Sequence, residues 1–477
     1  MEELPTTRVA RAWRWLAVIL AVSYVLRLVL IWSGGYRFWA DESRFGYPLE
    51  AAACLLRHEW VAALRNVIGS ADHLGFKVFG VIPGYIQIKY HFGYEFSLMF
   101  LGVFATFNIA WVWLIARRLG AGDAEALGSA LAMGCANSMY YWSRHLMPYD
   151  LALFWSLACL YVALKPSARW CDSLWAGILG CIAFVTYNGY WTIVAVALVL
   201  HVLLAWPHFW RGIWRALWAL GGLVGPYFLL LYVALWTLKV YLLESYLTFS
   251  GSINQGDFKD GYGVIVGYFW AAESLMCAVW LAAISWILLR AFKGRVERRA
   301  WFFLGAIVAI AGSLVVGANV LGKFVVYGRL ARQMVPFLAL LTGHVFFDRW
   351  EFWNARVPRA VAGGTLIALG AWNFSGPLRL VFPPQFEARG AAIIAGLDAE
   401  ASKAGRPAIP RDRFRFIYTT FIWPAPAPQD LPPRYRVLLE AAHPLDYQPY
   451  MYEGFGVAQR ATFRHSDFRM KLIEVKD

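Results

Sequence analysis

Two adjacent carboxylates and an arginine follow the first long apolar segment of the chain. One serine separates Asp41 and Glu42 from Arg44, and aromatic residues stand on both sides of the group. A carboxylate in this position can act as a general base, and an arginine can bind an anion. The same residues could instead cap a helix, with Asp41 as the N-cap and Glu42 in the first turn. The two interpretations are compatible, because a capping residue can also take part in chemistry.

Six basic residues are candidates for binding a phosphate on the side of the membrane where we expect Asp41. The best candidate pair for a phosphate clamp is Arg329 with Arg332, and the others are Arg27, Arg44, Lys77 and Arg144. A sugar carried on polyprenyl phosphate would suit such cations, since its leaving group is already a stable anion and needs no general acid. One carboxylate would then suffice as the base that activates an acceptor. The alternative for each cation is a long side chain that reaches along the membrane interface without a chemical role.

Three further residues are candidates for binding the acceptor. Glu244 and Glu273 flank a polar loop, and Tyr149 begins an apolar segment shortly after a basic turn. For the two acids, the alternative is a hydrated helix end without a role in binding.

A divalent metal ion is also compatible with the sequence. Asp41 or Glu42 could hold such an ion together with a lipid phosphate, because carboxylate and phosphate oxygens are ligands of hard cations. His73 beside Asp72 is too small a set of ligands to predict a metal site by itself.

The composition defines the class of protein. The chain has 477 residues, of which 60% are hydrophobic and 16% are charged, and its mean hydropathy is +0.50. A soluble domain could not bury that much apolar surface, so we expect an all-α protein that crosses a membrane many times. The net charge of +14 could indicate a nucleic-acid partner. The basic residues lie mostly in short loops between apolar segments, however, so no nucleic acid is expected.

Eleven segments are apolar enough to be predicted as transmembrane helices. They lie near 13–32, 95–116, 124–142, 149–164, 172–187, 189–206, 214–242, 264–290, 300–320, 333–347 and 359–374. Lys and Arg gather in every second connection, which by the positive-inside rule places those connections and the N-terminus in the cytoplasm. An odd number of spans then places the C-terminal region on the outer side.

The chain is expected to divide into a transmembrane domain over 1–375 and an outer domain over 376–477. The first outer loop, 33–94, is long. Apolar residues recur at helical spacing over 49–67, which predicts an amphipathic helix in the membrane interface. A second interfacial helix is expected between 75 and 93.

The composition of the outer domain differs from that of the rest of the chain. Proline becomes frequent, and charged and apolar residues alternate over 413–418 and 468–473, which predicts strands. The segment 388–404 has a helical pattern. Together these patterns predict a small α+β domain.

With these motifs, the chain resembles the GT-C superfamily of integral-membrane glycosyltransferases, and within it the protein O-mannosyltransferase and aminoarabinose (lipid A) transferase families. The segment Asp41-Glu42-Ser43-Arg44-Phe45 is similar to the Asp-Glu-x-Arg-aromatic start of the first outer loop in the aminoarabinose transferases. The other similar segments are Ile82-Pro83-Gly84-Tyr85, Tyr90-His91-Phe92-Gly93, Ser143-Arg144, Tyr149-Asp150 and Arg329-Leu330-Ala331-Arg332. The resemblance covers roughly 20–340, and its motifs are short.

The resemblance implies an enzyme of the bacterial inner membrane that transfers a single sugar, with inversion, from polyprenyl phosphate to an acceptor on the periplasmic face. It implies Asp41 as the catalytic carboxylate, Glu42 as its neighbour in the site, and Arg44 as a residue that binds the donor phosphate or orients the carboxylate. The lysine that aminoarabinose transferases carry before the closing proline of the loop is missing, and Val81-Ile82 stand there. The resemblance therefore fixes neither the sugar nor the acceptor, which could be a glycan, a lipid or a protein.

The main alternative to a transferase is a transporter or flippase of a lipid-linked sugar. Transporters typically have paired interrupted helices and ionisable groups near the membrane midplane. Here the charges crowd the outer ends of the predicted spans, which favours the enzyme. A third interpretation, a scaffold that only presents the outer domain, gives no reason for the outer cations.

Overall fold

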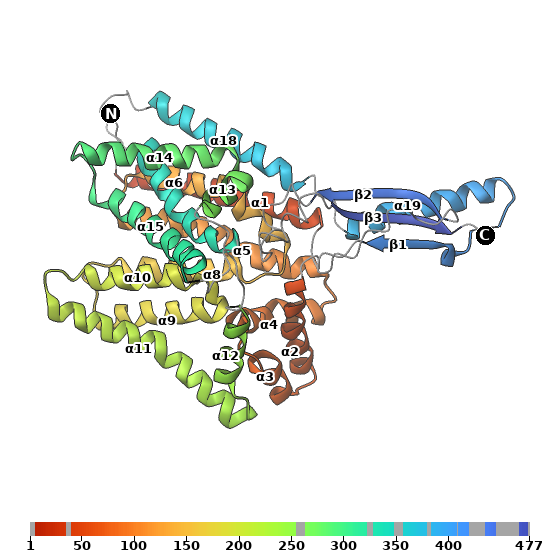
Figure 1. The fold of residues 1–477 in the computed structure, drawn as a ribbon, viewed down its shortest axis with the longest axis horizontal. Helices are drawn as coiled ribbons and strands as arrows, with labels where there is room; N and C mark the ends of the chain where they lie inside the picture. Colours follow the sequence, from red (N-terminus) through yellow and green to blue (C-terminus); the bar gives the residue numbers. More distant parts are fainter. Residues whose placement is uncertain are drawn as a thin grey trace.

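The computed structural model describes residues 5–34, 40–253, 263–321, 328–347, 356–378, 383–407, 409–418, 435–444 and 467–475. Most of them belong to a bundle of helices (Figure 1). The longer helices of the bundle are α1 (Pro5–Trp32), α5 (Tyr94–Arg118), α6 (Asp123–Cys135), α8 (Tyr149–Ala163), α9 (Trp170–Thr186), α10 (Trp191–Leu203), α11 (Phe209–Val233), α13 (Val264–Glu273), α14 (Leu275–Phe292), α15 (Arg298–Asn319), α17 (Val335–Phe347) and α18 (Arg356–Leu378).

Short helical turns and one longer helix, α12, connect these helices at the end of the bundle that carries the first outer loop. They are α7 (Ser138–Tyr141), η2 (Trp142–Arg144), η3 (Asn188–Tyr190), the π-helical turn η4 (Ala234–Leu238), α12 (Leu242–Ile253), α16 (Gly328–Ala331) and η5 (Arg332–Met334). Each turn begins or ends a helix, so backbone N–H and C=O groups that lack a partner within a helix are concentrated at this end of the bundle.

Each of the eleven predicted spans coincides with at least one helix, but the helices differ in length. Among the described residues, six are long and apolar enough to cross a membrane: Ala10–Trp32, Tyr94–Arg118, Phe209–Leu238, Leu275–Phe292, Arg298–Gly317 and Arg329–Phe347. Three shorter apolar helices cover Tyr149–Ala163, Trp170–Thr186 and Asn188–Leu203. The chain is therefore a helical membrane protein, while the number of eleven spans stays a prediction.

Two of the predicted spans are interrupted. The segment 124–142 forms α6 and the separate helix α7, and 264–290 forms α13 and α14, which are joined at Ser274. Ser274 has a φ of 50° and a ψ of −124°, a conformation that no helix contains. The carboxylate of Glu273 accepts two hydrogen bonds of 2.7 Å from the backbone N–H groups at the start of α7. The break after α13 thus supplies the partner for N–H groups that the break before α7 leaves unpaired.

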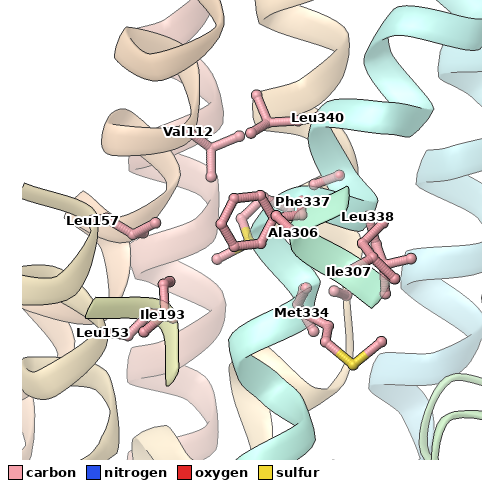
Figure 2. Packing of buried hydrophobic residues seen from close by; sticks show 14 of the residues in the cluster. Val112, Leu153, Leu157, Ile193, Ala306, Ile307, Met334, Phe337, Leu338 and Leu340 are labelled. Atoms are coloured by element: carbon pink, nitrogen blue, oxygen red, sulfur yellow. The ribbon is translucent and has the colours of Figure 1, made fainter. Parts of the chain in front are cut away.

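The centre of the bundle is a continuous apolar core. Figure 2 shows the ring of Phe337, from α17, among side chains that α5, α8, α10 and α15 contribute. The labelled neighbours are Val112, Leu153, Leu157, Ile193, Ala306, Ile307, Met334, Leu338 and Leu340. The described side chains of α17 are buried along nearly its whole length, so this helix packs on other helices on all sides.

Helices α9 and α11 approach each other closely through two glycines, and both lie beside α10 (Figure 1). A Cβ atom on Gly222 would lie 2.1 Å from the carbonyl oxygen of Leu174, and one on Gly177 would lie 2.0 Å from the carbonyl oxygen of Ala219. Small residues at such positions allow helix backbones to pack tightly where no hydrophobic effect drives association. The pair of glycines therefore fixes how α11 lies on α9.

The opposite end of the bundle gathers basic residues, as the sequence predicts for the cytoplasmic connections. Arg299 and His344 both contact the buried carboxylate of Glu125, at 2.7 and 3.0 Å. Arg118 donates to the carbonyl oxygen of Tyr161 at 2.7 Å. These contacts fix how the connections at this end pack, and the orientation of the chain in a membrane stays a prediction.

The first outer loop contains a 3-10 turn and three helices: η1 (Ala40–Phe45), α2 (Gly46–Leu56), α3 (Trp60–Ile68) and α4 (Leu74–Lys89). The single helix predicted over 49–67 is wrong, because the chain turns at His58, which has a φ of 62°. The second predicted helix is confirmed as α4. Its Gly75 lies against α9, where a Cβ atom would meet the backbone of Thr186 at 3.0 Å. Helix α4 is thus anchored directly on the end of α9.

The C-terminal region forms a small α+β unit beyond the loop-bearing end of the bundle (Figure 1). It consists of α19 (Pro383–Lys403), the turn η6 (Arg411–Arg413), β1 (Phe414–Tyr418), β2 (Tyr435–Pro444) and β3 (Asp467–Val475). The strands form an antiparallel sheet in the order β1-β3-β2, and Phe386 and Ile394 of α19 pack with Met470 and Leu472 of the sheet. The predicted helix and two strands are confirmed, and β2 is an addition.

Candidate functional site

Glu42 is buried at the junction between the first outer loop and the turn before α8. Its carboxylate accepts a hydrogen bond of 2.8 Å from the backbone N–H of Leu146 and lies 3.4 Å from Nδ1 of His145. Only 4% of the residue is exposed. Glu42, which the resemblance implies as a neighbour of the catalytic carboxylate, therefore anchors the first outer loop on the bundle through Leu146 and His145.

Asp41 directly precedes Glu42 in the turn η1, and its side chain lies outside the described residues. Helix α2 begins only at Gly46, and its N-cap residue is Phe45. The two acids thus lie one turn before α2 and do not cap it. The hydrogen bond of the buried Glu42 holds the backbone of η1 against the bundle. The backbone of Asp41, the preceding residue, is therefore held there as well.

Arg44 belongs to a polar cluster with Asp72, His73 and Lys77, which we call the Arg44 cluster. Arg44 Nη1 donates to Nε2 of His73 at 2.6 Å, and its Nε lies 3.4 Å from Oδ2 of Asp72. Lys77 Nζ lies 3.0 Å from Oδ1 of Asp72 and donates to the Ser70 hydroxyl at 2.6 Å. The Lys77 side chain is fully buried, whereas 26% of the Arg44 side chain is exposed. Lys77 therefore supports the cluster from inside, and Arg44 is the cation that faces outward.

The charges of the cluster shift the pKa values of its members. Burial raises the pKa of Asp72, but the hydrogen bond from Ser70 and the charges of Lys77 and Arg44 outweigh burial and hold that pKa below its ordinary value. Burial lowers the pKa of Lys77, and the attraction of Asp72 offsets only part of this effect. Asp72 is therefore ionised at neutral pH, as its contact with Arg44 requires.

Arg329 lies at the same end of the bundle and is linked to the Arg44 cluster by aromatic rings. Its Nη1 donates to the Tyr149 hydroxyl at 2.6 Å. The buried Tyr149 ring packs edge-on against Tyr187, with ring centroids 4.9 Å apart. The Tyr187 ring lies 5.4 Å from the ring of His73. Two partly exposed arginines from distant parts of the sequence are thus joined through three rings.

Arg27, Arg144 and Arg332 are fully buried. Arg332 forms an ion pair of 2.5 Å with Asp150. Arg27 donates hydrogen bonds to the carbonyl oxygens of Ser23 in α1 and Met139 in α7. Arg144 donates to the carbonyl oxygens of Leu30, near the end of α1, and Pro377, near the end of α18. Burial lowers the pKa of Arg144 to about 10. The predicted clamp of Arg329 with Arg332 is not formed in this conformation, because only Arg329 has exposed surface.

The three candidates for acceptor binding lie in different surroundings. Glu273 is fully buried and binds the start of α7, and Tyr149 is 1% exposed and holds Arg329. Glu244 is exposed on α12. In this conformation, only Glu244 among the three could touch a molecule from outside, and the other two support the site from within.

A divalent metal ion finds no complete set of ligands among the described residues. No group of three or more His, Cys, Asp or Glu side chains in that part of the chain could hold one. Asp72 and His73 are both engaged with Arg44. The side chain of Asp41 lies outside the described residues, so the metal hypothesis is not tested there.

The sequence missed what Asp72, His73 and Tyr187 do. The Asp-His pair was visible in the sequence as an incomplete metal site, whereas the structure uses it to orient Arg44. His73 takes a left-handed backbone conformation, with a φ of 48°, at the start of α4. Tyr187 carries no local signal, because its partners come from other helices.

The comparisons with known proteins identify no family. No model of a protein family matches the chain, and the search of curated proteins finds no significant match. The resemblance to the GT-C superfamily therefore stays a prediction from a few short motifs, and the function must be argued from the geometry.

Proposed function

We propose that the protein is an inverting glycosyltransferase that moves one sugar from polyprenyl phosphate to an acceptor at the loop-bearing end of the bundle. The observation that carries the proposal is the row of contacts that links two partly exposed arginines, one of them in the same turn as Asp41. This row consists of Arg44, His73, Tyr187, Tyr149 and Arg329. Outward-facing cations on such a support suit a phosphate that must be bound and released repeatedly.

In the proposed reaction, Asp41 accepts the proton of the acceptor group as that group attacks the anomeric carbon of the sugar. The attack comes from the face opposite the phosphate, so the configuration at the anomeric carbon is inverted. The bond between that carbon and the phosphate oxygen breaks, and its electron pair leaves with polyprenyl phosphate. Arg44 and Arg329 stabilise the charge of the departing phosphate, so no general acid is required.

The buried charges have a supporting role in this proposal. Glu42 fixes the turn that carries Asp41, and Lys77 fixes the carboxylate that orients Arg44. Arg332 and Asp150 form a buried pair next to Tyr149, which in turn binds Arg329. Preorganised groups of this kind lower a barrier more effectively than mobile ones, because they need not be reoriented during the reaction.

The partners follow from the chemistry and from the apolar helices. The donor is a sugar on a polyprenyl phosphate in the lipid bilayer, and the acceptor is a glycan, a lipid or a protein. We place the protein in a bacterial inner membrane, with the N-terminus in the cytoplasm and the loop-bearing end with the C-terminal domain in the periplasm. The bias of Lys and Arg along the sequence supports this orientation.

A transfer assay that measures both the release of polyprenyl phosphate and the appearance of label on an acceptor tests the proposal against the flippase alternative. Purified protein in liposomes is given polyprenyl phosphate that carries a radiolabelled hexose, together with bacterial envelope lipids, glycans and proteins. A transferase releases polyprenyl phosphate in the same amount as label appears on another molecule. Label that stays on the lipid and only changes leaflet would contradict the proposal and favour a flippase.

A further inference from the structure

The turn between α14 and α15 carries basic side chains that the proposed reaction does not use. It lies at the end of the bundle opposite the first outer loop (Figure 1). The side chains of Lys293, Arg295 and Arg298 are exposed there. Glu297 is the single acid between positions 290 and 299, and it pairs with Arg299 at 2.7 Å. The turn therefore presents a concentrated positive charge.

Other connections at the same end neutralise their cations within the protein. In the connection between α5 and α6, Arg117 lies 2.8 Å from Oδ1 of Asp123. In the connection between α8 and α9, Lys165 lies 2.9 Å from Oδ1 of Asp172. The three exposed cations of the α14–α15 turn form no ion pair with any carboxylate in the described part of the chain. Their charge is therefore available to an anion from outside the chain.

The backbone presents two of these cations in a defined geometry. The N–H of Arg295 donates to the carbonyl oxygen of Arg290 at 3.0 Å, and the N–H of Gly294 donates to that of Ala291 at 2.9 Å. Gly294 has a φ of 64°. This pair of bonds around a left-handed glycine is the Schellman motif, which closes the end of α14. Lys293 and Arg295 thus stand on either side of a fixed turn.

Stabilisation of helix ends does not explain all three cations. Basic residues at the C-terminus of a helix interact favourably with its dipole, which suits Lys293 and Arg295 after α14. Arg298, however, is the first residue of α15, where the same dipole disfavours a positive charge. An external anion between the two helix ends would interact favourably with all three side chains.

Large apolar side chains are exposed beside the cations. Phe292, the last residue of α14, is 91% exposed, and Leu289, one turn earlier, is 57% exposed. Trp301, in the first turn of α15, is 49% exposed. Aromatic and aliphatic side chains next to basic ones are typical of a membrane interface, where the apolar parts meet acyl chains and the charges meet headgroups. The combination favours a lipid over a soluble anion.

We propose that the α14–α15 turn binds the headgroup of an anionic phospholipid, with its acyl chains against Phe292, Leu289 and Trp301. The phosphate of the lipid pairs with Lys293 and Arg295. In the predicted orientation this lipid belongs to the cytoplasmic leaflet, whose anionic lipids attract basic segments next to membrane spans. The assignment does not rest on the proposed function, because the turn lies at the end of the bundle away from Asp41.

Lipid binding to the purified full-length protein in detergent tests the assignment. Native mass spectrometry measures the affinity for dioleoyl phosphatidylglycerol and for dioleoyl phosphatidylethanolamine, which has the same chains but no net charge. The test variant is Lys293→Gln/Arg295→Gln. The matched control is Arg117→Gln/Lys165→Gln, which also removes one lysine and one arginine from this end, both of them paired within the protein. Thermal unfolding checks that the variants are folded.

We expect the wild type to bind phosphatidylglycerol more tightly than phosphatidylethanolamine. The test variant should lose roughly tenfold to thirtyfold of its affinity for phosphatidylglycerol, the value of two basic residues at a lipid surface. The control variant should bind as the wild type does.

Two further measurements separate a lipid from a free phosphate. Phe292→Ser should weaken the binding of both lipids by roughly threefold to tenfold, because the contact with the acyl chains does not depend on the headgroup. Millimolar sn-glycerol 3-phosphate, which carries the phosphate without acyl chains, should leave phosphatidylglycerol bound.

Four outcomes would overturn the assignment. Equal affinity of the wild type for the two lipids would remove the role of charge. Equal losses in the test and control variants would show that only the total charge matters. Displacement by glycerol 3-phosphate would indicate a site for a soluble phosphate. A test variant that binds phosphatidylglycerol as tightly as the wild type would refute the lipid site and favour an acidic protein as the partner of the turn.

Discussion

At the residue scale, burial separates cations that the sequence could group only by their place in the chain. The motifs could not tell Arg44 and Arg329, which have exposed surface, from Arg332, which has none. The reason is that the partner of each cation lies far away in the sequence. Asp150 neutralises Arg332, and Asp72 with His73 orients Arg44.

The Arg44 cluster gives a prediction about stability. In an Asp72→Asn variant, the ammonium group of Lys77 stays fully buried but loses the only carboxylate that it contacts among the described residues. Leaving a buried charge uncompensated costs about 3 kcal/mol or more. We expect a clear fall in the thermal unfolding midpoint of the purified protein. The control is Glu59→Gln, which breaks the exposed pair of Glu59 with Arg57 and should leave the midpoint unchanged. Equal effects of the two substitutions would contradict the assigned role of Lys77.

The same cluster gives a pH dependence with a defined sign. The pKa of Asp72 is lowered in the folded protein from its ordinary value of 3.8. Its contribution to stability is therefore complete above about pH 4 and is lost as the pH falls through the lowered pKa. We expect the difference in unfolding midpoint between the wild type and Asp72→Asn to be constant between pH 7 and 5 and to shrink towards pH 3. A difference that grew on acidification would show that the Asp72 carboxylate does not stabilise the fold.

At the scale of elements, the sequence predicted the helices far better than their interruptions. Long apolar segments leave a helix as the only way to satisfy the backbone in a membrane, so their positions could be predicted. The turn at His58 and the break at Ser274 could not, because each depends on contacts with other segments. Strand β2 was missed for a related reason: its register shifts between Val437 and Leu439, which disturbs the alternation that predicts a strand.

The contact between α9 and α11 gives a prediction at this scale. Gly222→Ala places a methyl group within 2.1 Å of a backbone carbonyl of α9, so the two helices must move apart. Overpacking of this kind costs about 1–3 kcal/mol. The adjacent Gly221 has nothing within 4 Å of a Cβ atom, so Gly221→Ala is a matched control with the same change of helix propensity. Thermal unfolding should show a loss for Gly222→Ala only, and equal midpoints would contradict the close packing.

At the scale of the whole molecule, the two ends of the bundle have different characters. One end carries the first outer loop, the candidate site and the C-terminal domain, and the other carries the basic connections (Figure 1). From the spacing of apolar segments and from Lys and Arg, the sequence predicts that these two ends lie on opposite sides of a membrane, and this orientation stays a prediction. The sequence could not predict which side chains of the first end meet, since that depends on how α4 and α9 pack at Gly75.

Cysteine labelling tests the orientation of the molecule in the membrane. Glu59 and Arg295 are exposed at opposite ends of the bundle. In cells with a permeabilised outer membrane, a membrane-impermeant maleimide should label Glu59→Cys at once and Arg295→Cys only after the inner membrane is disrupted. The reverse order would place the candidate site in the cytoplasm and remove the proposed periplasmic reaction.

The measurement that tests the central claim most directly is the rate at which Asp41→Asn releases polyprenyl phosphate in the transfer assay. Asparagine keeps the size of the side chain but cannot act as a base. We expect the rate to fall by at least about 100-fold, the lower bound for the loss of a general base. The unfolding midpoint should stay close to that of the wild type, and Glu59→Gln should keep the full rate. A folded Asp41→Asn protein that transfers sugar at a rate comparable to the wild type would contradict the account.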